Sequence, residues 1–598
     1  MLQIQRFRRL AAMVAVVSVI AAACGDDAEP AAPTTTLDEP ACTSIADDDL
    51  SVARIWNEAA LDAVRRDFPA PTVHARNLFH LSVAMWDTWA AFDAGADGHL
   101  VDEIADLPAT ELDTAISAAA HRLLSTRYDQ ADGAGASLNA FDETLWSVCG
   151  DPTDPAATPA SAFGVAVADA VLAATAADGA DDPGSYEAVN PPLYVPLAYT
   201  SMADPNRWQP LEFVQQFSQT GQAMSATVQE FVSPHWGSVT PFALDGPAPL
   251  PIDPGDPPYL TGDPETDAVF VDAAVEVLRY SATLDPTDGV TIDIGPGAWG
   301  DSTLGTDDGT GHRLNPATAE PYDPNEVLAA DYGRVVAEFW ADGPDSETPP
   351  GHWNTLANEI SDALAATGDL RIGGLGDAID RLQWDVKLYL ALNGATHDAA
   401  VAAWGAKEHY DYVRPISMIR YLAGLGQSSD PTQPNYHPQG LPLTEGLVRL
   451  GPGDEIEVRT WQGAPDDPQT ETSGVGWIRG GEWVPYQQPT FVTPAFAGYV
   501  SGHSTFSRAA AEVLTAFTGD PYFPGGIGEW TIAADSLHFE SGPTTDITLQ
   551  WATYRDAADQ AGFSRLYGGI HVWADDYLGR EMGAEIGDAA WAAARDLF

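Results

Sequence analysis

Lysine is nearly absent from this sequence. Lys387 and Lys407 are the two lysines among 598 residues, and 27 Lys and Arg stand against 87 Asp and Glu, for a formal net charge of −60 at pH 7. A field of this sign repels phosphate backbones, which argues against any nucleic-acid partner. Neither lysine lies in a Walker-A loop, so nucleotide binding of that kind is excluded. Salt adaptation or a GC-rich genome explains the acidity better than a specific cationic partner.

Long apolar runs are also missing, apart from the first residues. Basic Arg6, Arg8 and Arg9 precede a short apolar stretch, and three alanines lead to Cys24, so residues 1–23 are expected to be a signal peptide. A cysteine in this place is typical of a bacterial lipoprotein; cleavage nearby without lipidation is the alternative. No later run reaches the ~18 apolar residues of a membrane span. We expect an exported cell-envelope lipoprotein facing outside the cytoplasm, which meets the membrane only through its N-terminal lipid anchor.

Cysteine is scarce as well, since Cys42 and Cys149 are the two that remain. Residues 24–50 are rich in Asp, Pro, Thr and Ala, a composition typical of a flexible acidic tether. An exported compartment permits Cys42 and Cys149 to form a disulfide, whereas two free thiols are the alternative. The sequence leaves both open.

Hydrophobic residues recur with helical periodicity along much of the chain. Aromatic residues are abundant, with 18 Trp, 19 Tyr and 20 Phe. The pattern predicts a mainly α fold, two helical bundles packed as one large domain. We expect an N-terminal helical half over 51–236, an irregular connecting region over 237–323 and a C-terminal helical half over 324–598. A Pro/Gly-rich insertion over 428–494 is expected to hold a small hairpin near Trp477 and Trp483. The predicted helices are 52–68, 72–92, 110–128, 161–177, 212–232, 263–284, 325–340, 353–367, 375–392, 397–422, 504–517, 546–560 and 572–597.

Three basic segments in the second half carry the chemistry. In the first, Lys407 and Arg414 are seven residues apart, so on one helix they would project from one face. In the second, Ser501, Gly502 and His503 lead into a helix whose N-terminal N–H groups would bind an anion. A solvated charged face and a plain N-cap by Ser501 are the alternatives.

The third basic segment contains Arg565, His571 and Asp575. Arg565 is a permanently charged bidentate donor, and Asp575 lies four residues after His571, where its carboxylate can orient the imidazole. A His–Asp pair alone is often a surface pair. A single oxyanion site formed by all three segments explains them together, which the separate alternatives do not.

At this point the sequence resembles the vanadium-dependent haloperoxidases and the related type-2 phosphatidic-acid phosphatases. Their shared pattern is Lys-x6-Arg-Pro, then Pro-Ser-Gly-His, then Ser-Arg-x5-His-x3-Asp. All three parts are present here, with Val500 in place of the proline before Ser501. The similarity extends to residues 397–400 and, more weakly, to residues 56–59 and 339–344.

The resemblance implies a vanadate cofactor and a role for each motif residue. His571 Nε2 would be the vanadium ligand, and His503 the acid–base residue that handles the protons of peroxide. The equatorial oxygens would be held by Lys407, Arg414, Ser501, Gly502 and Arg565. The expected reaction is oxidation of halide by hydrogen peroxide to hypohalous acid, with bromide as the expected halide, chloride as a further candidate, and an organic acceptor as a further partner.

Trp404 and Phe496 are expected on the halide side of this pocket. Trp404 precedes Lys407 by three residues and Phe496 precedes His503 by seven, the offsets of an aromatic pair in chloride-oxidising members of the family. An apolar wall there would partly desolvate a halide. Burial of both rings in the core is the alternative.

Two other functions compete with halide oxidation. A phosphoric ester hydrolase would use the same pocket, with His571 as nucleophile, Asp575 orienting it and His503 protonating the leaving oxygen. A non-enzymatic exported scaffold with a decayed site is the third, which the intact set of site residues disfavours.

Overall fold

The computed structural model describes residues 50–149, 158–181, 186–216, 223–341 and 346–598. The expected signal peptide, Cys24, the tether and Cys42 lie outside the described residues, and so does the question of a Cys42–Cys149 disulfide. From residue 50 on, the described residues belong to one compact unit.

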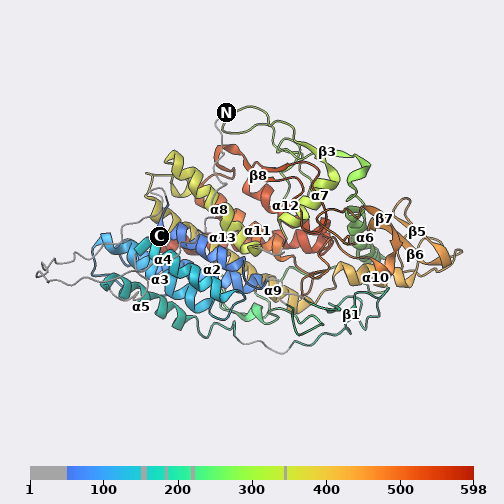
Figure 1. The fold of residues 1–598 in the computed structure, drawn as a ribbon, viewed down its shortest axis with the longest axis horizontal. Coiled ribbons are helices and arrows are strands. Elements are labelled where there is room, and N and C mark those ends of the chain that lie inside the picture. Colours follow the sequence, from blue (N-terminus) through green and yellow to red (C-terminus); the bar gives the residue numbers. More distant parts are fainter. Residues whose placement is uncertain (1–49, 150–157, 182–185, 217–222, 342–345) are drawn as a thin grey trace, which may run out of the picture. The chain divides into compact units, whose positions relative to one another are not determined.

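Helices dominate this unit, which confirms the prediction of a mainly α fold (Figure 1). None of the described helices is long and apolar enough to cross a membrane. The described α-helices are α1 Val52–Val64, α2 Pro71–Ala90, α3 Leu112–Arg127, α4 Ala134–Cys149, α5 Pro159–Ala174, α6 Pro264–Ser281, α7 Ala329–Phe339, α8 Thr348–Thr367, α9 Arg381–Tyr410, α10 Pro415–Leu425, α11 Gly502–Thr518, α12 Tyr554–Tyr567 and α13 Trp573–Leu597.

The first five helices form one bundle. Helix α3 packs against α2, α4 and α5, while α1 contacts α3, α4 and α8. Helix α2 is buried on nearly all sides, because it lies between this bundle and α9. Helix α4 was not predicted, since its glycine-rich start does not have the composition of a helix N-terminus.

Helix α11 lies at the centre of the second bundle, in contact with α8, α9, α12 and α13 (Figure 1). Gly579, Gly583 and Gly587 recur every fourth residue on α13 and face the backbone of α11. A Cβ atom at any of these positions would lie 2.6–3.0 Å from an α11 side chain or carbonyl oxygen. Because the stripe has no side chains, the two helices approach closely enough to bring Ser501 beside Asp575.

Helix α9 joins the two bundles as one uninterrupted helix, whereas the sequence predicted separate helices over 375–392 and 397–422. Gly394 does not break it: a Cβ there would lie 2.4 Å from Cδ1 of Phe242, so this glycine allows a ring to pack on the helix. The helix ends at Tyr410, and Asp411 adopts a left-handed conformation with φ 45°. Pro415 then begins α10.

The strands form small sheets at the margins of the helices. In the described residues one pair is parallel, β1 Leu193–Tyr194 with β2 Leu211–Glu212. The other pairs are antiparallel: β3 Thr291–Asp293 with β4 Glu326–Leu328, and β8 Gly528–Ile532 with β9 Ile547–Trp551. The three-stranded sheet is antiparallel too, with β6 Ile456–Trp461 between β5 Val448–Leu450 and β7 Val475–Arg479. The hairpin predicted near Trp477 is therefore paired differently: Trp477 in β7 lies opposite Arg459 in β6, and Trp483 follows a 3-10 turn.

Two predicted helices are wrong. The stretch 212–232 has no helix in its described residues; Phe213 and Gln229 make backbone hydrogen bonds to Thr227 and Leu211 instead. Its valines and phenylalanines favour extended backbone. The stretch 546–560 contains β9, whose burial alternates along residues 547–551, and α12 begins only after the capping box of Thr553 and Asp556.

Candidate active site

The structure brings all eight site residues of the three basic motifs, Asp575 in the first turn of α13 included, to one place in the second bundle. Lys407 comes from the last turn of α9, Arg414 is the N-cap of α10, and Arg565 lies in the last turn of α12. The others are Ser501, the N-cap of α11, with Gly502 and His503 in its first turn, and His571, just before α13. The expectation that Lys407 and Arg414 share one helical face is wrong, because the chain turns at Asp411 between them.

His571 is fixed by contacts at both ring nitrogens. Its Nδ1 lies 2.8 Å from Oδ2 of Asp575, and its Nε2 lies 3.1 Å from Nη1 of Arg414. A carboxylate only accepts and a guanidinium only donates, so Nδ1 carries the proton and Nε2 presents its lone pair. His571 lies two residues before α13 rather than on it, and Asp575 is in the first turn of that helix.

Asp575 links two of the motifs. Its carboxylate also accepts from the backbone N–H of Val572, and its own carbonyl accepts from the N–H of Ser501 at 2.8 Å. Gly569, with φ 69°, makes the tight turn before His571. Asp575 thus fixes the position of the His571 imidazole relative to the turn at Ser501.

Lys407 is fully buried, and its ammonium group holds the loop before Ser501. Its Nζ donates to the carbonyls of Ala497, Gly498 and Val500 at 2.9, 2.9 and 2.6 Å. The three carbonyls thus accept all three N–H hydrogens of the ammonium group. An oxyanion bound by Lys407 must therefore replace at least one of these carbonyls.

Helix α7 supplies contacts that the sequence analysis did not assign. Arg565 Nη2 donates to the carbonyl of Ala337 at 2.7 Å, and His503 Nε2 lies 2.5 Å from the carbonyl of Trp340. The weak similarity over 339–344 pointed to this segment, but a backbone carbonyl leaves no side-chain signature in a sequence. Asp342 of that motif lies outside the described residues.

Trp404 and Phe496 are buried and lie against each other beside the cations. Their ring centroids are 4.8 Å apart at an interplanar angle of 52°. The Phe496 centroid is 5.1 Å from Lys407 Nζ and 5.1 Å from Arg414 Cζ. The indole N–H of Trp404 donates to the carbonyl of Val232, which fixes the ring as an apolar wall next to two positive charges.

The electrostatics of the cluster favour an anion. Every one of its side chains belongs to a residue that is at most 6 % exposed, and three are cations: Lys407, Arg414 and Arg565. Burial, with Arg414 as the next cause, lowers the pKa of Lys407 well below its usual value. Burial raises the pKa of Asp575 to about 7, against the opposing effect of Lys407. Buried like charges are costly unless a counter-charge is bound, so this site is suited to a small oxyanion.

Both histidines are held in their neutral forms. Burial lowers the pKa of His571 well below its usual value, and Arg414 and Lys407 add to the shift. Burial lowers the pKa of His503 as well, followed by the charge of Arg565. The site therefore offers two neutral imidazoles among fixed cationic donors.

Comparison with known proteins agrees with this geometry. Residues 387–598 match the family model of the VCPO second helical-bundle domain. No protein with a curated description matches the sequence. The structure is similar to that of an apo-type bacterial vanadium-dependent chloroperoxidase, at 18% identity and a TM-score of 0.60 over 88% of this chain and 93% of that one.

Two further solved structures have the same fold. A holo-type bacterial vanadium-dependent chloroperoxidase is 17% identical, with a TM-score of 0.60 over 94% of this chain and 96% of the other. A structure described as the first bacterial vanadium-dependent iodoperoxidase is 18% identical, with a TM-score of 0.54 over 92% and 98%.

The fold is thus that of the vanadium-dependent haloperoxidases. The match to the model of the VCPO second helical-bundle domain covers residues 387–598, in the second half of the chain. The resemblance expected from the three motifs is confirmed, and all three motifs lie within the matched residues.

Proposed function

We propose that this protein is a vanadate-dependent haloperoxidase that oxidises bromide with hydrogen peroxide to hypohalous acid, with chloride as a further substrate. The observation that carries the proposal is the buried cluster itself, where Arg414 donates to Nε2 of His571 at 3.1 Å and the charges of Lys407 and Arg565 lie near enough to lower the pKa of this imidazole. An enzyme that uses a tetrahedral oxyanion needs such fixed donors.

The residues present fit vanadate. His571 would ligate vanadium through Nε2 once Nη1 of Arg414 moves from that nitrogen to a vanadate oxygen, and Arg565, Ser501 and the N–H of Gly502 would hold the other oxygens. Lys407 would join them after exchanging one carbonyl of the 497–500 loop. When bound, vanadate supplies a Lewis acid that activates hydrogen peroxide toward halide.

The remaining side chains hold protons and shape the pocket. Asp575 keeps the proton on Nδ1 of His571, so the lone pair stays on Nε2. His503 donates from Nε2 to the carbonyl of Trp340, which makes Nδ1 the atom that accepts a proton from hydrogen peroxide. Trp404 and Phe496 exclude water on one side, so a halide there is partly desolvated.

Halogenation and ester hydrolysis, run side by side, test the proposal. Protein loaded with vanadate is expected to brominate a phenol dye with bromide and peroxide, and the same protein without vanadate is expected to be inactive. The metal-free protein is assayed in parallel on a phosphate monoester. Ester hydrolysis with no halogenation by any halide would assign the pocket to a phosphohistidine mechanism with His571 as nucleophile.

We also propose that the protein is a lipoprotein of the cell envelope, on the basis of Cys24 and the segments around it. Wild-type protein is expected in the membrane fraction, and Cys24→Ser is expected to release it or to block its maturation. Fractionation followed by mass spectrometry of the N-terminal peptide measures this. Wild-type protein found entirely in the medium with an unmodified Cys24 would contradict it.

A further inference from the structure

An apolar cavity of about 430 Å³ lies at the ends of β1, β2, β6 and β7, in the loops that follow these strands. None of the described residues that line it is charged, although 19% of the residues of the whole chain are. Phe213 and Trp461 form buried aromatic walls, whereas Val214 is 73% exposed at the rim. A lining without charges selects a neutral ligand, because an ion would lose its hydration there without gaining a counter-charge.

One buried polar side chain, that of Gln487, faces an unfilled hydrogen-bonding role in this wall. The residue is 5% exposed, and its Nε2 donates to the carbonyl of Gly568 at a long 3.4 Å. Its Oε1 has no hydrogen-bond partner among the described residues. Because Gln487 lines the cavity, this oxygen can accept from an O–H or N–H group that enters it. The space is called the Gln487 cavity below.

The Gln487 cavity lies beside the turn that leads to His571. A Cβ atom at Gly569 would lie 3.0 Å from Cβ of Pro485, which is part of the cavity wall, and Gly568 provides the carbonyl that Gln487 contacts. His571 follows Gly568 by three residues, which span at most about 11 Å of chain. A small molecule released at the oxyanion site is therefore formed close to the cavity.

A second hollow of about 260 Å³ continues from the Gln487 cavity toward the halide side of the oxyanion site. The two spaces share Phe213 and Thr490 in their walls. The second is also lined by Val232 and Ala495, which are joined by a backbone hydrogen bond of 2.9 Å. The carbonyl of Val232 accepts from the indole of Trp404 at 3.0 Å. The two hollows together thus extend to the back of the aromatic wall that Trp404 forms.

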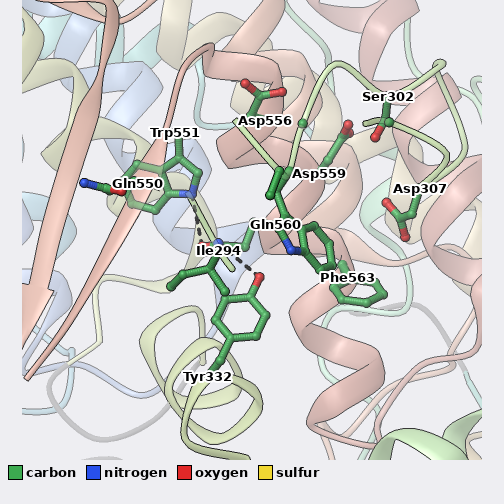
Figure 2. A pocket seen from close by; sticks show the side chains of 14 residues that line it. Ile294, Ser302, Asp307, Tyr332, Gln550, Trp551, Asp556, Asp559, Gln560 and Phe563 are labelled. Carbon is green, nitrogen blue, oxygen red and sulfur yellow. Dashed lines mark hydrogen bonds between the residues drawn. The ribbon is translucent and has the colours of Figure 1, made fainter. Parts of the chain in front are cut away.

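The cavity in Figure 2, beside α12, differs because its polar groups bind one another. Gln560 accepts from the indole N–H of Trp551 at 3.0 Å and donates to the hydroxyl of Tyr332 at 3.3 Å. Asp559 forms ion pairs with two arginines. These groups are satisfied within the protein, whereas the Oε1 atom of Gln487 is not, so the Gln487 cavity is the better ligand site.

We propose, on the basis of the halide oxidation proposed above, that the Gln487 cavity binds the organic acceptor that hypobromous acid brominates. The acceptor would be a neutral, electron-rich arene with one O–H or N–H group, such as a phenol. Its hydroxyl would donate to Oε1 of Gln487, and its ring would pack against Phe213 and Trp461. The volume lies in the lower part of the ~300–1,000 Å³ range of ligand pockets, which suits one or two rings.

The bromination balances without a further reactant. A ring carbon of the phenol attacks the bromine of hypobromous acid, so that a C–Br bond forms and the O–Br bond breaks. The proton on that carbon leaves with the hydroxide as water. The cavity would contribute by holding the arene where the oxidant emerges, which raises the local concentration of one acceptor over others in solution.

Titration of the metal-free protein with 2-naphthol, followed by calorimetry in about 0.5 M NaCl, tests the site without any peroxidase activity. The salt screens the repulsion of anions by a chain of charge −60. 2-Naphthol is expected to bind at one site, at least about tenfold more tightly than 2-naphthalenesulfonate, which is charged. It is expected to bind at least about threefold more tightly than 2-methoxynaphthalene, which has no hydrogen to donate. No saturable binding of 2-naphthol, or equal binding of the sulfonate, would overturn the proposal.

Two variants probe the wall of the cavity. Gln487→Leu is expected to remove the preference for 2-naphthol over its methyl ether, because leucine has no acceptor. Val214→Glu is expected to weaken 2-naphthol binding at least about fivefold by placing a charge at the apolar rim, and its exposure keeps the test valid if Gln487→Leu fails to fold. Val290→Glu, 52% exposed and outside the cavity, is the matched control and is expected to bind normally. Unchanged binding by Val214→Glu, or a preference retained by folded Gln487→Leu, would contradict this site.

A competition assay tests the acceptor role. Vanadate-loaded protein with bromide and peroxide receives equal amounts of 2-naphthol and 4-hydroxybenzenesulfonate, and the ratio of brominated products is compared with that given by added hypobromous acid. The enzyme is expected to favour 2-naphthol at least about fivefold more than the free reagent does, and Val214→Glu is expected to return the ratio to the reagent's value with peroxide consumption unchanged.

A wild-type ratio equal to that of the free reagent would overturn the acceptor role, since both phenols would then react in solution. Binding of 2-naphthol without bromination of either phenol would contradict halide oxidation itself, while the titration would still support the ligand class of the cavity.

Discussion

Replacing His571 with alanine is expected to abolish tight vanadate binding. The lone pair of this imidazole is fixed on Nε2, beside Arg414, because Asp575 holds the proton on Nδ1. Loss of residues that only orient a metal ligand costs about 10–100-fold in affinity, so loss of the ligand itself is expected to cost at least 100-fold. Equilibrium dialysis of the purified protein against vanadate measures this, with one vanadate per chain expected for the wild type.

The matched control for this variant is His538→Ala, since His538 is exposed in a loop and donates only its backbone N–H to Glu338. That variant is expected to retain vanadate as the wild type does. Circular dichroism confirms that both variants keep the fold. Vanadate retention by a folded His571→Ala at the wild-type level would refute the assignment of His571 as ligand.

Replacing His503 with alanine is expected to lower kcat for bromide oxidation by about 10²–10⁴-fold while vanadate affinity changes little. The reason is the position of the ring. It is fixed by the carbonyl of Trp340 at Nε2 and buried at the N-terminus of α11, where it can take up a proton but is not placed as the ligand.

His503→Gln separates proton transfer from positioning. A glutamine amide can still donate to the carbonyl of Trp340 but cannot accept a proton as an imidazole does. We expect the glutamine variant to be as slow as the alanine variant. Recovery of most of the wild-type kcat by His503→Gln would show that the ring only positions its neighbours, and a parallel loss of vanadate binding in both variants would assign it to the cofactor instead.

The motif residues could be found from the sequence because the site is made from a few side-chain types at fixed spacing. The route by which they meet could not. Arg414 reaches His571 because Asp411 turns the chain out of α9, and no periodicity argument shows a single residue in the left-handed conformation. The contacts of Lys407, Arg565 and His503 with carbonyls of the 497–500 loop, Ala337 and Trp340 depend on backbone position alone.

The fold, like the site, was predicted correctly in some parts and wrongly in others. Long stretches with helical periodicity, such as α1, α2, α11 and α13, were predicted within a few residues of their bounds. The predictions are wrong where the local sequence is compatible with more than one backbone conformation. The predicted helices left a break around Gly394, but this glycine lies inside α9 and allows a ring to pack on it. The residues of 212–232 belong to extended backbone that pairs within the segment and, at Val232, with Ala495. In both places tertiary contacts decide between conformations that the local sequence permits equally.

The continuity of α9 has a consequence for how this protein can be divided. The family match begins at residue 387, in the second turn of a helix that begins at Arg381. Just before that border, the carboxylate of Asp385 accepts hydroxyl hydrogen bonds from Ser51, the N-cap of α1, and from Ser361 of α8, both at 2.5 Å. The segment that the family model matches therefore does not coincide with a unit that folds by itself. A fragment that starts at residue 387 would lose these hydrogen bonds at the start of α9, the helix that carries Lys407 about 30 Å further along. Truncated forms of this protein should therefore begin upstream of α1 and keep both bundles.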